Sequence, residues 1–222
     1  MLFYLIFALP GLLLGLWAQV ALRGTFARYA RVPTASGIDG AGTAQKLISE
    51  LGLRIGVRST QGQLTDFYDP SSKTINLSQS SGTNSIASVA VVAHELGHAQ
   101  QDAENYGPLK LRGAIVPAVQ LGAWVGPLLF IVGLYLNSQS LSFIGLIAFS
   151  AAAVFALITL PVELDASRRA LVMLSSHGIL DAQELPGAQK VLRAAAMTYV
   201  AAALQTLGTL LYYVSIFAGR RR

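Results

Sequence analysis

The 222-residue chain is far more apolar than a soluble domain of its size, with 53% hydrophobic and only 12% charged residues. This composition excludes an ordinary soluble globular protein and indicates a membrane protein. The formal net charge of +5 does not indicate nucleic-acid binding, because the basic residues flank apolar stretches and form no compact patch with interleaved aromatic residues. The absence of cysteine excludes disulfides and zinc–thiolate sites, so any metal must bind His, Asp or Glu.

The first uncharged stretch, residues 1–22, is long enough to cross a bilayer, since about 20 apolar residues span the hydrocarbon core. It lacks the positively charged start of a signal peptide, and its apolar run is longer than the roughly 7–15 residues of such a segment. We therefore predict an uncleaved transmembrane anchor.

Residues 23–112 are more polar and have the signals of a small α/β element that forms part of a membrane-proximal catalytic region. The spacing of apolar residues predicts a helix that is capped by Asp39 and ends at Gly52. Short strands are then predicted over residues 53–59 and 72–78.

The segment between these two strands contains turn residues, including Gly62 and the pair Asp69-Pro70. The second strand precedes the next helix, so it is either an edge strand that could pair with an extended substrate or part of an ordinary internal hairpin.

A loop rich in serine and glycine leads into a helix predicted over residues 86–102, with Asn84 or Ser85 as its N-cap. This helix carries the sequence HELGH at residues 94–98. Residues four apart lie on one face of a helix, so the two histidines can bind the same tetrahedral ion. The glutamate is rotated by about 100° from the first histidine and therefore lies beside the metal.

This pattern suits peptide hydrolysis by a zinc-activated water, with His94 and His98 as ligands and Glu95 as the general base. The same carboxylate can later give a proton to the leaving amine. The motif is short enough to occur by chance, and catalytic zinc takes three protein ligands. A third ligand is therefore the deciding feature.

Residues 113–160 are uncharged and predict a transmembrane hairpin with its turn at residues 137–140. Because the chain crosses the membrane and returns, the second polar segment, residues 161–193, lies on the same face as the motif helix. Glu163 and Asp165 both qualify as the third ligand on these grounds. The other candidates downstream are His177, Asp181 and Glu184.

A last uncharged stretch, residues 194–219, completes four predicted spans, with a basic C-terminus in the segment 194–222. Residues 23–112 and 161–193 carry 13 of the 16 lysines and arginines, so the positive-inside rule places them, and the site, in the cytoplasm. Residues 220–222, all arginine, conflict with this topology. Either the flank of the first span dominates the orientation, or the last stretch is a re-entrant or interfacial segment that ends inside.

The motif at 94–98, together with ELDASRRA at residues 163–170, resembles the YugP-type neutral zinc metallopeptidases of bacterial membranes. The segments LTDFYDP at 64–70 and AAMTYVAAA at 195–203 resemble the same family, so that matches cover most of the chain. The layout is more distantly similar to the HtpX and CAAX prenyl protease family. In that family a glutamate from a later helix completes the HExxH zinc site, which is the gluzincin arrangement.

The resemblance implies that Glu163 is the third zinc ligand. The distant relatives usually carry an aspartate four residues beyond this glutamate, where this chain has Ser167 and a nearby Asp165. If Asp165 is not a ligand, it could accept a hydrogen bond from His94 or His98 and fix the tautomer of that ring.

Two further residues each have two interpretations. His177 either donates to an oxyanion or hydrogen-bonds a free carbonyl at a helix end. Tyr199 either anchors the last span at the interface or takes the oxyanion role.

The sequence thus predicts a mainly α, multi-pass membrane protein with about four transmembrane helices and a small α/β element before the HExxH helix. The function favoured is a zinc metalloendopeptidase in the cell membrane, with a peptide or membrane-protein substrate. An intramembrane protease of the site-two type is less favoured, because the motif helix is too polar to span. A non-catalytic scaffold or assembly factor with a vestigial or structural metal site has no need of a base at Glu95.

Overall fold

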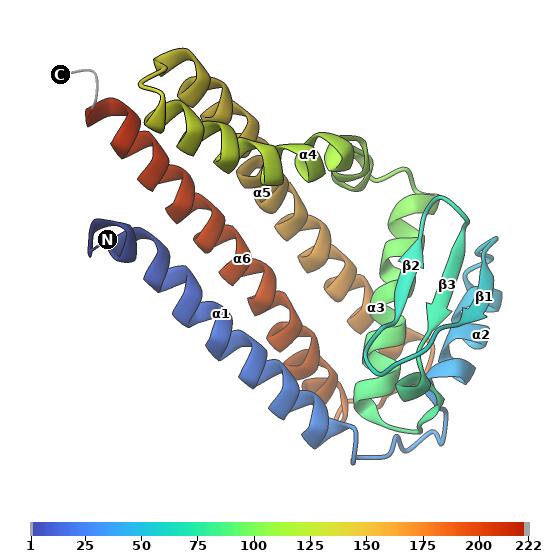
Figure 1. Ribbon diagram of the computed structural model, residues 1–222. Coiled ribbons are helices and arrows are strands. Elements are labelled where there is room, and N and C mark those ends of the chain that lie inside the picture. Colours follow the sequence, from blue (N-terminus) through green and yellow to red (C-terminus); the bar gives the residue numbers. More distant parts are fainter. Residues whose placement is uncertain (1, 220–222) are drawn as a thin grey trace. The chain divides into compact units, whose positions relative to one another are not determined.

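The computed structural model describes residues 2–219 (Figure 1). The described part of the chain is mainly helical, with a small three-stranded sheet, as predicted. It divides into two compact units. The HExxH unit comprises residues 19–106 and 162–196, and the apolar unit comprises, within the described residues, 2–18, 107–161 and 197–219.

Four of the described helices are long and apolar enough to cross a membrane, which confirms the predicted number of spans. These helices are α1 (Leu2–Tyr29), α4 (Gly107–Tyr135), α5 (Gln139–Ser176) and α6 (Leu185–Gly219). The predicted turn separates α4 from α5, and within it Asn137 has a φ of 53°, a left-handed conformation that asparagine tolerates. The three C-terminal arginines lie outside the described residues.

Glycines allow the helices of the apolar unit to pack closely. A Cβ atom added to Gly122 of α4 would lie 2.3 Å from the carbonyl oxygen of Ala148 on α5. One added to Gly208 of α6 would lie 2.2 Å from the carbonyl oxygen of Phe7 on α1. Helix pairs in membranes commonly pack through such small residues.

The HExxH unit begins its α/β element with α2 (Gly40–Glu50), which has the predicted cap. The Asp39 carboxylate accepts a hydrogen bond of 2.7 Å from the backbone N–H of Gly42. The helix stops before Gly52, whose φ of 63° favours glycine.

The sheet consists of β1 (Gly56–Ser59), β2 (Phe67–Asp69) and β3 (Thr74–Leu77), in the order β1-β3-β2. Strand β1 is parallel to β3, and β2 is antiparallel to it. The interpretation of the second predicted strand as an edge strand is wrong, because β3 is the central strand. Strand β2 was not predicted: it leads into the turn at Asp69, whose carboxylate accepts hydrogen bonds from the backbone and hydroxyl of Ser71.

A short 3₁₀ turn, η1 (Gln79–Gly82), precedes α3 (Ile86–Ala103). Ser85 caps α3, since its hydroxyl accepts a hydrogen bond from the backbone N–H of Ser88. Buried side chains of α3 form the centre of the core of this unit, and Figure 1 shows α3 beside the sheet. The Ser85 cap, the core packing and the sheet together hold the motif helix in place.

Candidate metal centre

Three potential metal ligands converge within the HExxH unit. His94 and His98 extend from α3, and Glu163 extends from α5. The Nε2 atoms of the two histidines lie 3.1 Å and 3.6 Å from Oε2 of the glutamate, and the three ligand atoms all lie within 4.8 Å of one another. His98 and Glu163 are far apart in the sequence, and the packing of α5 against α3 brings them together.

The approach of α5 to α3 depends on Gly97, which lies between the two histidines. A Cβ atom at this position would lie 2.6 Å from the carbonyl oxygen of Ala166 and 3.1 Å from its Cα. Any side chain here would therefore push α5 away from α3. Because Glu163 lies one helical turn before Ala166, this crossing brings its carboxylate to the histidines.

The geometry and chemistry of the three side chains fit a zinc ion. Atoms bound at about 2.0–2.2 Å to a tetrahedral zinc lie about 3.4 Å from one another, which is close to the two distances above. Burial alone would lower the pKa of His98, but its contact with Glu163 and the negative charges of Glu95 and Glu163 raise it overall. The negative charges of Glu95 and Glu163 thus favour positive charge at His98. Two histidines and one carboxylate are also a donor set of catalytic zinc sites.

Each histidine uses its second ring nitrogen to contact a neighbouring polar side chain. Nδ1 of His94 lies 3.1 Å from the hydroxyl of Ser167 on α5. Nδ1 of His98 lies 3.0 Å from Oε1 of Gln101, one turn further along α3. The Nε2 atoms of both rings are left to face Glu163. Such contacts hold ligand histidines in position.

Asp165 lies outside the three-residue group. Its carboxylate accepts hydrogen bonds from the side-chain amide of Gln101 at 2.9 Å and from Nε of Arg169 at 2.6 Å. Asp165 was predicted to be either a ligand or a direct hydrogen-bond partner of His94 or His98. The structure connects it to His98 through Gln101, a residue that sequence reasoning missed.

Glu95 lies next to this cluster and is held by strand β2. Its Oε2 accepts a hydrogen bond of 3.0 Å from the backbone N–H of Tyr68. Burial raises the pKa of the Glu95 carboxyl above its ordinary value, and the charges of His94 and His98 oppose this rise. This environment makes the Glu95 carboxylate a better proton acceptor than an exposed one.

Two residues of the sheet region, Tyr68 in β2 and Lys73 just before β3, contact the end of α3. The hydroxyl of Tyr68 donates to Oδ2 of Asp102 at 2.6 Å, and Nζ of Lys73 donates to the same oxygen at 2.5 Å. The Tyr68 contact was not predicted, because it depends on β2, a strand that the sequence did not reveal. The Lys73 contact depends on the packing of β3 against α3, which was not predicted either.

The remaining candidate ligands have other partners. His177 contacts Glu50 through Nδ1 at 2.5 Å. Asp181 accepts from the backbone N–H groups of residues 183 and 184, and Glu184 accepts from the backbone N–H of Ala35. These contacts fasten the segment between α5 and α6. Tyr199 lies on α6 within the apolar unit, and its role stays a prediction.

Known proteins resemble this chain over nearly its whole length. Residues 4–218 match a family described as "Putative neutral zinc metallopeptidase". The chain is 43% identical over 220 residues to a Bacillus subtilis (strain 168) protein named "Putative membrane protease YugP", a match that covers 98% of both chains. No solved structure matches the chain significantly. The chain therefore belongs to this zinc metallopeptidase family, as its sequence motifs predicted.

Proposed function

We propose that the protein is a membrane-embedded zinc metalloendopeptidase in which His94, His98 and Glu163 hold the metal. The observation that carries this proposal is the convergence of these three side chains beside Glu95. A site with three protein ligands leaves a fourth position for water or substrate, as catalytic zinc requires.

Zinc, when bound, polarises the scissile carbonyl and lowers the pKa of a water molecule. Glu95 acts as the general base that takes the proton of the attacking water and then gives it to the leaving amine. Two features of the chain prepare this carboxylate for the task. The N–H of Tyr68 holds one of its oxygens, and burial raises its pKa, so that it is a stronger base than an exposed glutamate.

The proposed substrate is a peptide segment of a membrane protein or a peptide near the bilayer. Four candidate spans anchor the chain, and the regions that carry the site also carry most of the lysines and arginines. The positive-inside rule then favours the cytoplasmic face of the cell membrane for the site. Helix α3 is not among the candidate spans within the described residues, which argues against a motif helix that itself crosses the bilayer.

Exchange of the general base tests this function against a non-catalytic scaffold. The Glu95→Gln variant, purified in detergent, should keep its zinc and lose at least about 100-fold in the hydrolysis of a fluorescently labelled denatured protein. Glu50→Gln, which removes a carboxylate from α2, is the control and should retain activity. Equal turnover in Glu95→Gln and wild type would overturn the role of Glu95. A wild-type protein that binds zinc without any turnover would favour the scaffold.

A further inference from the structure

Gln101, three residues after His98 on α3, has a fully buried side chain. Both its amide nitrogen and its amide oxygen have partners. Its amide nitrogen donates to the backbone carbonyl oxygen of Val162 and to Oδ2 of Asp165, each at 2.9 Å. Its amide oxygen faces Nδ1 of His98 at 3.0 Å. One side chain therefore connects α3 with two residues of α5.

The partners of Gln101 determine which way its amide must point. A backbone carbonyl and a carboxylate can only accept hydrogen bonds, so the NH₂ group must face Val162 and Asp165. The amide oxygen then faces His98, and because this oxygen can only accept, Nδ1 of His98 must carry a hydrogen. The lone pair of the neutral ring is thereby placed on Nε2, the atom that faces Glu163.

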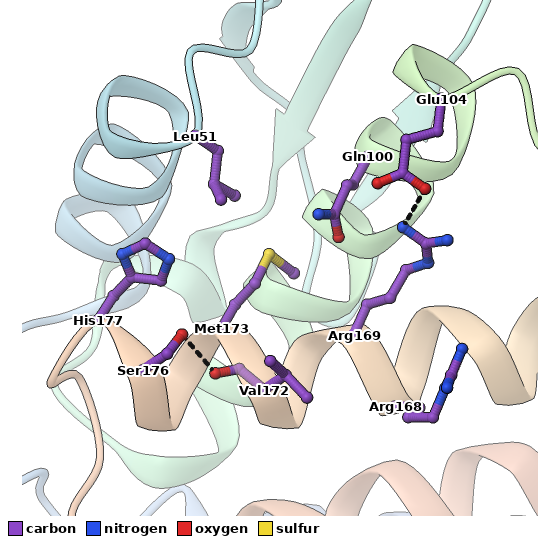
Figure 2. Close-up of a pocket in the computed structure, with 9 residues that line it drawn as sticks. All are labelled: Leu51, Gln100, Glu104, Arg168, Arg169, Val172, Met173, Ser176 and His177. Carbon is purple, nitrogen blue, oxygen red and sulfur yellow. Dashed lines mark hydrogen bonds and ion pairs between the residues drawn. The ribbon is translucent and has the colours of Figure 1, made fainter.

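The orientation of the amide is reinforced from outside. Asp165 is held by Nη2 of Arg168 at 2.5 Å and by Nε of Arg169 at 2.6 Å. Nη1 of Arg169 in turn contacts Glu104 at 2.8 Å, the ion pair drawn in Figure 2. A flip of the Gln101 amide would leave an NH₂ group facing a ring N–H and an oxygen facing a carboxylate.

The two histidines differ in this respect. The partner of His94 is the hydroxyl of Ser167, which can either donate or accept. It therefore imposes no tautomer. Only Gln101, whose orientation is fixed by two obligate acceptors, imposes the tautomer that binds metal through Nε2.

We propose that Gln101 is a positioning residue that locks His98 in the Nδ1-protonated tautomer and thereby sets the affinity of the site for zinc. This inference rests on the proposed function, since it takes His98 as a zinc ligand. It adds a residue of the motif helix, outside the HExxH sequence, to the determinants of the metal site.

The first test compares Gln101→Leu with Gln100→Leu in the full-length protein purified in detergent. Gln100 is the neighbouring glutamine on α3, and it lines the cavity of about 370 Å³ shown in Figure 2. Zinc affinity is measured by competition with a chromophoric chelator. We expect Gln101→Leu to bind zinc about 10- to 100-fold more weakly than wild type, and Gln100→Leu to match wild type.

A second pair of variants separates the hydrogen-bond pattern from a general loss of folding. Gln101→Glu keeps an acceptor for His98 but places a carboxylate against Asp165, so zinc binding should weaken. Adding Asp165→Asn to this variant restores an NH₂ donor between the two positions, so zinc binding should partly recover. The visible spectrum of the Co²⁺-loaded proteins reports the ligand geometry, and the double variant should be closer to wild type than Gln101→Glu.

The outcomes distinguish this inference from the proposed function. Wild-type protein that takes up no zinc overturns both. Wild-type protein that binds zinc no more tightly than Gln101→Leu overturns only the role of Gln101. The same holds if Asp165→Asn brings no recovery of zinc affinity in the Gln101→Glu background.

Discussion

The two units of the molecule are built from different kinds of contact. In the apolar unit, large side chains such as Leu121 and Trp124 point outward, 67% and 83% exposed, while glycines bring the helices together. In the HExxH unit, apolar side chains are buried inside, and polar ones such as Gln101 and Glu163 are buried with specific partners. The apolar unit is therefore defined mainly by its apolar surface and close helix packing. The arrangement of the HExxH unit also requires specific contacts between buried polar atoms.

The largest effect is expected where a backbone contact supports the polar cluster. Gly97→Val should destabilise the HExxH unit by about 3 kcal/mol and abolish zinc binding, because its side chain would meet the backbone of Ala166. Gly113→Val, on α4 of the apolar unit, is the control, because a Cβ atom there meets nothing within 4 Å. Thermal unfolding and zinc content measure both variants. Equal stability of the two would contradict the close crossing of α3 and α5.

Removal of the metal should affect stability somewhat less. A ligand that binds only the folded state stabilises it by about 2.7 kcal/mol when its free concentration is 100 times Kd. Addition of a chelator should therefore lower the Tm of the zinc-loaded wild type.

The same addition should leave the Tm of His94→Ala unchanged, because this variant lacks one of the proposed ligands. A chelator effect of equal size in both proteins would place the bound zinc elsewhere in the chain.

The smallest effect concerns the attachment of β2 to α3. Tyr68→Phe removes the hydroxyl that donates to Asp102 and should cost about 1 kcal/mol, the usual contribution of one hydrogen bond. Zinc affinity should not change, since the backbone N–H that holds Glu95 remains. A chelator competition and a denaturation curve on the same sample measure both quantities. A large loss of zinc affinity would show that the side chain itself supports the site.

Local patterns in the sequence were sufficient to predict the features that depend on neighbouring residues. The caps at Asp39 and Ser85, and the turn near Asn137, follow from the residue types at those positions. The number of candidate spans follows from uncharged length alone. These predictions needed no knowledge of how distant segments pack.

Features that depend on packing were not predicted. Strand β2 has three residues and is defined by its pairing with β3, while the residues after Asp69 are typical of a turn. The roles of Gln101 and Ser167 depend on the crossing of α3 and α5, which sequence spacing does not encode. Glu163 could be nominated because chain topology and family resemblance both pointed to residues just beyond the hairpin.

The zinc content of three proteins tests whether His94, His98 and Glu163 hold the metal. Wild type, Glu163→Ala and Asp165→Ala are supplied with zinc, freed of unbound metal and measured by elemental analysis. The three-ligand site predicts about one zinc per chain in wild type and loss of most of it in Glu163→Ala. Asp165→Ala should lose less, because Asp165 contacts His98 only through Gln101. Full retention of zinc by Glu163→Ala, or no zinc in the wild type, would rule out this three-ligand site.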